Sequence, residues 1–462
     1  MQIIEKLLLT DIAEKGHSIG RDPEGRVIFV ENALPGDVVD VKIYKKRKGI
    51  KFGSPIHFHQ KSENWISPFC SHFEYCGGCQ WQHLQYHAQL HFKEKLVHDA
   101  LQRLGKVEVE KYHPILAAPK TTRYRNKLEY TFANKTWLPK EAMDAGESRD
   151  QDAAGFYHPG TYDKVINIQT CHLQEEPSNA IRLEAKKIAA QLGISFYDLS
   201  KNTGTLRNLV IRTTSLGQTL VIVLFGKSDP KSQKKFLDAL LKSVPEITSL
   251  HFAINEKLNP SYYDLPIQLH HGKGYVEEQL GHLTFRIGPK SFFQTNTSQA
   301  VNLYSQVAKM ANLKGTENLY DLYTGIGSIG LFLAHQARQI VGIEEIPDAI
   351  KDAEMNAQIN GIKNAVFHAG DVKNILKKEF VDRYGAPDVL ITDPPRAGMH
   401  PDVVKMLIEL KSPKLIYVSC KPSTQARDLQ ELSAVYRVDE VMPVDMFPHT
   451  HHVENIAKLS LK

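Results

Sequence analysis

From about residue 283 to the C-terminus, the hydrophobic positions follow the two periods of alternating strands and helices. Leu283, Phe285 and Ile287 alternate with polar residues as in a half-buried strand, and a helix is predicted over roughly 298–310. The short apolar runs that follow predict strands over 318–322, 339–343, 365–368, 389–392 and 415–418. Helix-like segments separate these runs. This order predicts a doubly wound parallel sheet, in which ligands bind beyond the carboxyl ends of the strands.

The first half of the chain has a different pattern. Strand-like runs over 27–30 and 38–43 flank a turn at 34–37, which indicates a small, OB-like β-barrel over residues 1–60. A helical period over 85–105 ends at Gly105. The strand-like runs that come next are 128–132, 165–168, 209–213, 220–225 and 247–254, interrupted by a helix over 233–241. We therefore expect a multidomain α/β protein: the barrel (1–60), a central α+β domain (61–285) and a C-terminal Rossmann-like domain (286–462).

Composition narrows the class of protein. The chain has 462 residues, 42% of them hydrophobic and 24% charged, and contains no apolar run long enough to cross a bilayer. The apolar run within the first ten residues is short and lacks a cleavage-site pattern, so a cytoplasmic protein without a membrane partner is expected. Neither a repeat nor a coiled-coil pattern predicts an obligate protein partner. The net charge of +5 permits a polyanionic partner without requiring one.

A run of basic residues follows the second predicted strand of the barrel. It comprises Lys45, Lys46, Arg47, Lys48 and Lys51. Small barrels of this kind commonly present loops to oligonucleotides, although a solvated charge run at a hairpin tip fits equally well. The preceding sequence Gly-Asp-Val-Val-Asp-Val resembles a TRAM domain, an RNA-binding barrel, and this resemblance favours RNA contact. Further on, Tyr-Arg-Asn-Lys at 124–127 combines aromatic, basic and amide groups that suit RNA, or forms an ordinary exposed strand entry.

The five cysteines divide into four and one. Four of them, Cys70, Cys76, Cys79 and Cys171, can supply one metal centre, and the Gly-Gly pair at 77–78 lets the chain turn tightly. An odd number without a signal sequence argues against a disulfide framework. Zinc and an iron–sulfur cluster both accept four thiolates. Because zinc sites usually pair two short hooks and here the fourth cysteine stands alone, the spacing favours a [4Fe-4S] cluster with a structural role.

The sequence that closes the first parallel strand is a glycine loop. Gly325, Gly327 and Gly330 form Gly-x-Gly-x-x-Gly, and Glu344 ends the next strand, where a carboxylate can bind ribose hydroxyls. This pattern fits a nicotinamide-dependent oxidoreductase as well as an S-adenosylmethionine-dependent methyltransferase. The turn Asp-Pro-Pro-Arg at 393–396, after the fourth strand, favours the methyltransferase, which places such a turn beside cofactor and substrate base.

The fifth parallel strand leads to the remaining cysteine. Cys420 follows its carboxyl end, and Pro422 opens the next helix at a position where its missing N–H costs nothing. Enzymes that methylate exocyclic amino groups usually carry an aromatic residue after the two prolines, where this chain has Arg396. A thiol together with that arginine suggests a target carbon that must be activated covalently. The alternative for Cys420 is an inert buried thiol, the commoner fate of a lone cysteine.

Taken together, these motifs resemble the RNA uracil-C5 methyltransferases of the RumA/TrmA type, nearly end to end. The matching segments are 291–296, 321–327, 393–398, 418–422 and 446–449, with Glu454 beyond them. The N-terminal barrel and the four cysteines are similar to the ribosomal-RNA branch, so 23S ribosomal RNA is the expected target. Dual-specificity members share that architecture, and transfer RNA remains an alternative. The other alternative is a non-catalytic RNA-binding protein.

The resemblance implies roles for individual residues. Cys420 is expected to add to uracil C6, which makes C5 carbanion-like, and Glu454 to remove the C5 proton after methyl transfer. The residues implied to contact S-adenosylmethionine are Gln294, Tyr323, Ser328, Glu344, Asp371 and Asp393. We expect the uridine to leave its stack to reach this site. The histidines at 449, 451 and 452 are expected to shape the loop that carries Glu454, because no acid or thiol completes a metal site there in the sequence.

Overall fold

The computed structural model describes residues 2–47 and 49–462; Met1 and Lys48, the latter one of the predicted RNA-contact residues, lie outside the described residues. The first five strands close into a barrel in the order β1-β2-β3-β5-β4, which confirms the predicted small barrel. Its strands are β1 (Ile3–Ile12), β2 (Ser18–Arg21), β3 (Val27–Val30), β4 (Val38–Arg47) and β5 (Ile50–Gln60). In β4, Val39, Val41 and Ile43 alternate into the barrel core.

Only part of the basic run on this barrel is exposed to solvent. Lys45, Lys46 and Arg47 are exposed at the end of β4. Lys51 is instead buried, and its Nζ forms an ion pair with Asp22 at 2.9 Å. The prediction that Lys51 belongs to an RNA-facing run is therefore wrong, because the strand's pleat turns its side chain onto an internal carboxylate.

The central sheet is mixed and mostly antiparallel, in the order β13-β12-β11-β10-β7-β8-β9. Its strands are β7 (Lys127–Ala133), β8 (Ala153–Tyr157), β9 (Val165–Asn167), β10 (Leu206–Thr213), β11 (Thr219–Phe225), β12 (Ser249–Ile254) and β13 (Gln268–Gly272). Helices α3 (Ser178–Gln191) and α4 (Pro230–Ser243) bury their apolar faces in the core on one side of this sheet. A short helix, α2 (Lys140–Asp144), lies in the long connection between β7 and β8.

The C-terminal sheet has the order β18-β17-β16-β19-β20-β22-β21-β6. The five predicted parallel strands are present as β16 (Asn318–Leu322), β17 (Gln339–Glu344), β18 (Ala365–Ala369), β19 (Val389–Thr392) and β20 (Lys414–Ser419). The chain reverses its direction of winding between β16 and β19, and this switch point is where α/β sheets bind ligands. Antiparallel β22 (Glu454–Leu461) and β21 (Tyr436–Val444) extend the sheet beyond β20.

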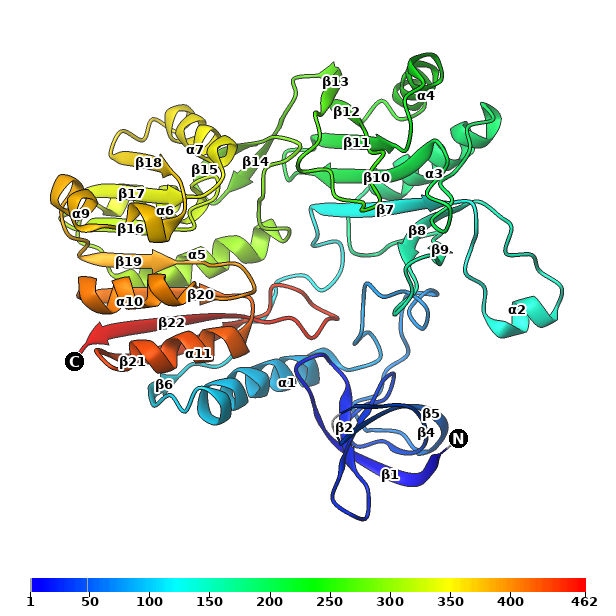
Figure 1. Cartoon of the computed structure of the whole chain (residues 1–462), viewed down its shortest axis with the longest axis horizontal. Coiled ribbons are helices and arrows are strands. Elements are labelled where there is room, and N and C mark those ends of the chain that lie inside the picture. Colours follow the sequence, from blue (N-terminus) through cyan, green and yellow to red (C-terminus); the bar gives the residue numbers. More distant parts are fainter. Residues whose placement is uncertain (1, 48) are drawn as a thin grey trace.

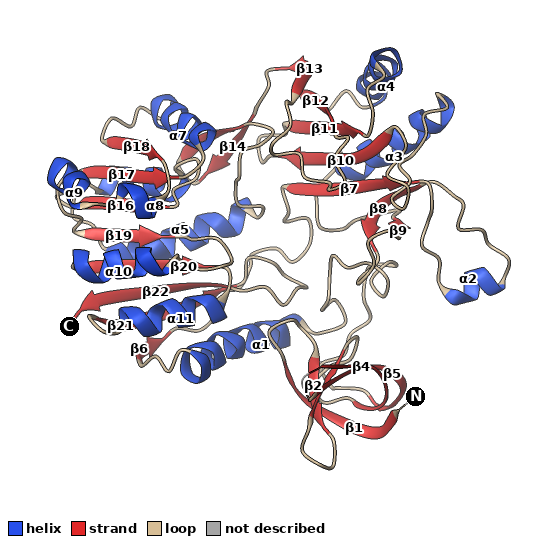
Figure 2. Ribbon diagram, in the orientation of Figure 1, coloured by secondary structure: helices blue, strands red, loops and turns tan. Residues whose placement is uncertain are grey.

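Helices cover both faces of this sheet, as Figure 2 shows. Because neighbouring strand residues point to opposite faces, Leu319 and Ile416 enter one core while Tyr320 and Leu415 enter the other. The first core also contains residues of α5 (Thr297–Ala311), α6 (Ser328–Leu333), α7 (Pro347–Ile359) and the hairpin β14–β15 (Val276–Leu280 and Leu283–Ile287). The second contains residues of α8 (Val372–Ile375), α9 (Lys378–Tyr384), α10 (Pro401–Leu410) and α11 (Pro422–Leu432).

One segment of the predicted central domain packs against this C-terminal sheet. Helix α1 (Tyr86–Asp99) continues as a π-helical turn (Ala100–Leu104), and both contribute side chains to the core on the α11 face. Strand β6 (Val109–Tyr112) then pairs in parallel with β21 and covers that edge of the sheet. Figure 1 shows α1 beside α11, with one end of the helix toward the barrel. Across the described residues, no helix has both the length and the apolar character needed to span a membrane.

Candidate active site

The thiol of Cys420 lies where the sequence pattern predicts it, between the end of β20 and the start of α11. Ser419 ends the strand, and its Oγ accepts a hydrogen bond from the backbone N–H of Lys421 at 3.1 Å, which turns the chain. Pro422 then begins α11. The half-buried Cys420 side chain lines a cavity of about 480 Å³. The nucleophile candidate is thus held on a rigid turn that opens onto a space for a ligand.

Glu454 begins the neighbouring strand and is almost fully buried, with 4% of its surface exposed. The antiparallel register of β20 and β22 pairs Ser419 with Asn455, so Cys420 and Glu454 occupy the next positions of the two strands. Burial and the nearby Asp393 carboxyl raise the pKa of Glu454 to about 8, against the opposing charge of Arg396. A carboxyl group with this pKa is mostly protonated at pH 7 and half-ionised near pH 8, and its ionised form can act as a general base.

The Asp-Pro-Pro-Arg turn after β19 faces both of these residues. Burial, with a contribution from Asp321, raises the pKa of Asp393 to about 7. Burial and the charges of Glu454 and Asp393 raise the pKa of the Cys420 thiol to about 11, and Arg396 acts in the opposite direction. The thiol is therefore protonated at neutral pH, and its proton must leave as the sulfur attacks. Arg396 is the cation placed to favour the thiolate.

The glycine loop between β16 and α6 is folded back by two carboxylates. Asp321 accepts hydrogen bonds from the Thr324 hydroxyl at 2.6 Å and the Gly330 N–H at 2.9 Å, and burial raises its pKa to about 6. Glu344 accepts from the Gly325 N–H at 3.1 Å. Gly325 has a φ of +57°, and no atom lies within 4 Å of the position that a Cβ would occupy there. The loop therefore leaves open space above its backbone, as a bound nucleoside requires.

Three residues implied to contact S-adenosylmethionine come from the ends of adjacent strands. Tyr323 follows β16, Glu344 ends β17, and Asp371 lies just beyond β18. Tyr323 adopts the left-handed conformation with φ +62°, and burial together with the charges of Asp371 and Glu344 raises its pKa. Lys373 lowers the pKa of Asp371. An aromatic ring near two carboxylates fits an adenosine group, since carboxylates bind ribose hydroxyls and the ring can stack on a base.

Besides Asp393, two other residues are implied to contact the cofactor, Ser328 and Gln294. Ser328 begins α6, and its hydroxyl is hydrogen-bonded to Tyr304 of α5 at 3.1 Å. Gln294 belongs to the segment before α5, and its backbone carbonyl accepts from the Asn126 side chain at 2.9 Å. That segment also contains Asn296, whose side chain donates to the Met446 carbonyl at 2.9 Å. Gln294 is thereby placed between the entry to β7 and the loop that leads to Glu454.

All four predicted metal-ligand cysteines line a second cavity, of about 410 Å³. Burial raises the pKa of all four thiols, to about 12 for Cys76 and Cys79. Within the described part of the chain, however, no three histidine, cysteine or acidic side chains stand in an arrangement that holds a metal ion. The structure thus gathers the four cysteines around one space without showing a formed metal centre.

Two contributions to the active site were not predicted from the sequence. The barrel supplies one wall of the Cys420 cavity through its β1–β2 turn, and Glu14 of that turn accepts a hydrogen bond from Ser423 at 2.6 Å. Helix α1 supplies Gln89 and Lys93, which bind the loop before Glu454. No local pattern identifies either contribution, because the partners lie more than 350 positions apart.

The fold and this site define a class of protein: a methyltransferase with a Rossmann-like catalytic domain, a cysteine at a strand end beside its cavity, and an attached RNA-binding barrel. Comparison with known proteins identifies the family of this methyltransferase. Residues 267–461 match the model of the tRNA (uracil-5-)-methyltransferase family, and residues 4–56 match the TRAM domain. The chain belongs to the RNA uracil-5 methyltransferase family and is an S-adenosylmethionine-dependent RNA methyltransferase.

Relatives of similar length support this assignment. A protein of Bacteroides thetaiotaomicron, described as an uncharacterized RNA methyltransferase, is 48% identical over 94% of this chain and 97% of its own length. One of Porphyromonas gingivalis with the same description is 46% identical over 98% of each chain. Among solved structures, the Pyrococcus abyssi tRNA (uracil-54, C5)-methyltransferase in complex with S-adenosyl-L-homocysteine has a TM-score of 0.75 and 28% identity, covering 98% of this chain and 99% of its own.

Proposed function

We propose that this enzyme methylates C5 of a uridine in 23S ribosomal RNA through a covalent adduct between Cys420 and C6, with Glu454 as the base. The observation that carries the proposal is the placement of a thiol and a buried carboxyl group at neighbouring strand ends. Both face the Asp393–Arg396 turn at the switch point of a methyltransferase sheet. Uracil C5 is a poor nucleophile, and an adjacent thiol is what its activation requires.

The reaction assigns a separate task to each residue. Cys420 gives up its proton to solvent in the cavity and its sulfur forms the bond to C6, so that the electrons of the C5–C6 double bond move into an enolate whose C5 is nucleophilic. Arg396 favours the thiolate before this step. S-adenosylmethionine, when bound by Tyr323, Glu344 and Asp371, supplies the methyl group for C5. Glu454 then accepts the C5 proton, the C5–C6 double bond re-forms, and the sulfur leaves as thiolate. For Asp393, Gln294 and Ser328 we propose contacts to the same cofactor.

The target RNA is proposed from the arrangement of the domains. The barrel and the four gathered cysteines are similar to the ribosomal-RNA branch of the family, which favours 23S ribosomal RNA. The structural relative from Pyrococcus abyssi is described as a tRNA methyltransferase and matches this chain over nearly its whole length, so transfer RNA is the second candidate. In the division that we propose, residues 1–60 bind RNA, residues 61–285 hold the cysteine centre and residues 286–462 carry out the transfer.

Mapping of 5-methyluridine tests this proposal directly. Ribosomal and transfer RNA are compared between cells with the protein, cells without it, and cells that carry Cys420→Ala. Loss of one 23S position in the second and third strains supports the proposal. Loss of a transfer-RNA position instead moves the target to transfer RNA. The catalytic assignment is overturned if cells that carry Cys420→Ala still make the modification. It is also overturned if the protein does not bind S-adenosylmethionine in calorimetry.

We propose further that the four cysteines hold a [4Fe-4S] cluster that joins the segment around 70–79 to Cys171. The support is that all four cysteines are partly buried and line one cavity, since four thiols gathered around one space can bind a cluster once they lose their protons to it. Protein purified without oxygen should be brown and contain about four iron and four sulfide per chain if the cluster is of this type. A colourless protein with one zinc would replace the cluster with a zinc site.

A further inference from the structure

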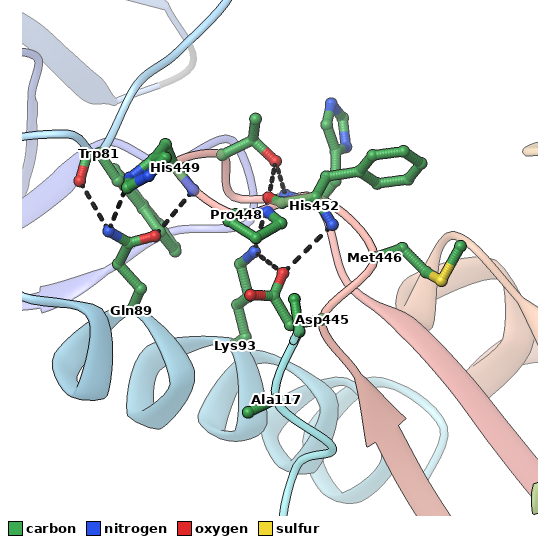
Figure 3. A network of polar contacts seen from close by, with 12 residues as sticks. Trp81, Gln89, Lys93, Ala117, Asp445, Met446, Pro448, His449 and His452 are labelled. Carbon is green, nitrogen blue, oxygen red and sulfur yellow. Dashed lines mark hydrogen bonds and ion pairs between the residues drawn. The ribbon is translucent and has the colours of Figure 1, made fainter. Parts of the chain in front are cut away.

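The loop that leads to Glu454 is held by one face of α1, a helix more than 350 positions away in the sequence. The loop connects β21 to β22 and comprises residues 445–453, which we call the base loop. Tyr86, Gln89 and Lys93 follow the i, i+3, i+7 spacing of one helix face, and all three bind the base loop. Figure 3 shows Gln89 and Lys93 reaching from the helix to this loop.

The strongest of these contacts is an ion pair with no exposure to solvent. Lys93 Nζ lies 2.5 Å from Asp445 Oδ1, and both side chains are 0% exposed. The same ammonium group donates to the Phe447 carbonyl at 2.9 Å. Asp445 also accepts from the Phe447 N–H at 3.2 Å and from the Tyr86 hydroxyl at 2.8 Å. Two buried charges thereby fix the first three residues of the base loop to α1.

Gln89 holds the middle of the base loop. Its side-chain carbonyl accepts from the His449 N–H at 2.8 Å, and its amide nitrogen donates to the Trp81 and Leu84 carbonyls at 3.0 and 2.8 Å. The His449 carbonyl accepts from the N–H groups of Gln80 and Trp81 at 2.8 and 3.0 Å. His449 has a φ of +64°, a conformation that a histidine keeps only when its surroundings impose it. The base loop therefore depends on α1 and the segment before it for its shape.

This arrangement has more charge than stability alone requires. A buried ion pair is offset by the cost of removing both charges from water, and apolar side chains of similar volume often serve stability as well or better. What apolar side chains cannot do is bind the Phe447 carbonyl and N–H in one fixed geometry. The base loop ends directly before Glu454, whose carboxyl must come within hydrogen-bond distance of the C5 proton.

We infer that Lys93, acting through Asp445, is a positioning residue for Glu454: the ion pair fixes the base loop so that the carboxyl group reaches C5 of the adduct. The inference rests on the proposed function, because Glu454 has no such task otherwise. It predicts that loss of the pair impairs release of the methylated product more than formation of the bond to C6, since the Cys420 turn is anchored separately by Ser419 and α11.

Two variants separate positioning from stability. Lys93→Met leaves Asp445 as an uncompensated buried charge and should lower the Tm strongly. The double variant Lys93→Met/Asp445→Leu removes both charges and should bring the Tm back toward that of the wild type. Lys234→Met, which removes an exposed ion pair with Asp238 on α4, is the matched control and should change neither stability nor turnover.

The readout uses two RNA substrates with the folded double variant. With 5-fluorouridine RNA the trapped adduct forms without any need for a base, and its yield should equal that of the wild type. With uridine RNA the methylated adduct should accumulate on denaturing gels, because its resolution slows by about 10- to 100-fold. Resolution at the wild-type rate, or equal loss of adduct formation and resolution, would overturn the positioning role.

The same gel distinguishes this inference from the proposed function. If Cys420→Ala forms no adduct and Glu454→Gln accumulates one, the proposed mechanism holds, and the double variant then decides the role of Lys93 alone. If Glu454→Gln releases product at the normal rate, Glu454 is not the base, and the positioning role is wrong together with it.

Discussion

Cys420 and Glu454 each lie one residue beyond Ser419 and Asn455, the last register pair of the antiparallel strands β20 and β22. A sulfur that adds to one ring carbon and a carboxyl group that deprotonates the adjacent carbon must lie close together, and neighbouring strands provide this spacing without a flexible loop between them. The arrangement also buries two acids and a thiol close together: burial, followed by the charge of neighbouring acids, raises the pKa values of Glu454, Asp393 and Cys420, and Arg396 opposes the shift of Glu454 and Cys420.

Replacement of the thiol tests the covalent step. Cys420→Ala should lower methylation by at least about a thousandfold, because nothing else near C6 can form the covalent bond. It should also form no adduct with 5-fluorouridine RNA on denaturing gels. S-adenosylmethionine should still bind in calorimetry, since Cys420 is not among the residues proposed to contact it. A variant that methylates normally would show that the reaction needs no covalent adduct with this cysteine.

Replacement of the carboxyl group should stop the reaction at a later point. Glu454→Gln keeps the size of the side chain but cannot accept the C5 proton, so the methylated adduct should accumulate while overall turnover falls by about 10²- to 10⁴-fold. A quenched time course with labelled RNA measures both quantities. Turnover at the normal rate would place the base elsewhere in the site.

The decay of the isolated methylated adduct should depend on pH. Glu454 has a pKa near 8, raised by burial and by Asp393 and opposed by Arg396; Cys420 and Tyr304 of α5 also face it. Only the ionised carboxylate accepts a proton, so decay should speed up about tenfold per pH unit from pH 6 and level off near pH 8. The profile of Glu454→Gln should be flat. A wild-type profile that is equally flat would contradict the assignment.

The same pKa shift has a consequence for stability. Glu454 titrates near 4.5 when the chain is unfolded and near 8 when it is folded, so the folded state holds the extra proton between these values. The contribution of Glu454 to the free energy of unfolding is fully present below pH 4.5 and is lost as the pH rises through 8. The free energy of unfolding of Glu454→Gln should therefore equal that of the wild type at low pH and exceed it by on the order of 3–5 kcal/mol above pH 8. Thermal unfolding across this range measures the difference, and equal Tm values at high pH would contradict it.

Much of the catalytic sheet could be predicted because its signals are local. The five parallel strands are continuous apolar runs, and the residues proposed to act, such as Glu344, Asp393 and Cys420, follow their carboxyl ends in the sequence. Two of the five barrel strands, β3 and β4, follow from equally local alternation, whereas closure of the barrel depends on pairing between distant strands. Where the pattern repeats over a few residues, the sequence carries enough information to place an element and its end.

Other features depend on contacts that no local pattern contains. Strand β6 joins β21 although 327 positions separate His113 from its partner Glu440 at that edge. Lys51 is indistinguishable in sequence from its exposed neighbours, and only the barrel's closure brings it to Asp22. Lys93 looks like an ordinary helix lysine until α1 is docked against the base loop. Ion pairs between distant parts of the chain could therefore be identified only from the structure.

The cofactor contacts proposed for the glycine loop give a separate prediction. Glu344 accepts from the Gly325 N–H at 3.1 Å and the Ile346 N–H at 3.0 Å, so Glu344→Ala removes a ribose-binding group and also loosens the loop. The Kd for S-adenosylmethionine should rise by about 10- to 100-fold, as expected for the loss of charge-assisted hydrogen bonds. Calorimetry without RNA measures it. Glu354→Ala, an exposed carboxylate on α7, is the control, and equal Kd values for both variants would remove Glu344 from the cofactor site.

RNA binding by the barrel can be tested through its salt dependence. Lys45 and Lys46 are exposed at the end of β4, and the Lys45 ammonium lies 5.8 Å from the ring centre of Phe52 on β5. A cation beside an aromatic ring suits one phosphate and one stacked base of single-stranded RNA. If each lysine neutralises one phosphate, Lys45→Ala/Lys46→Ala should reduce the slope of log K against log salt by about 1.4 to 1.8, and turnover at saturating RNA should be unchanged.

Lys187→Ala, which replaces an exposed lysine of α3, is the control and should leave the slope as it is. Fluorescence anisotropy at several salt concentrations measures all three proteins, and an unchanged slope in the double variant would show that RNA does not cross this end of the barrel.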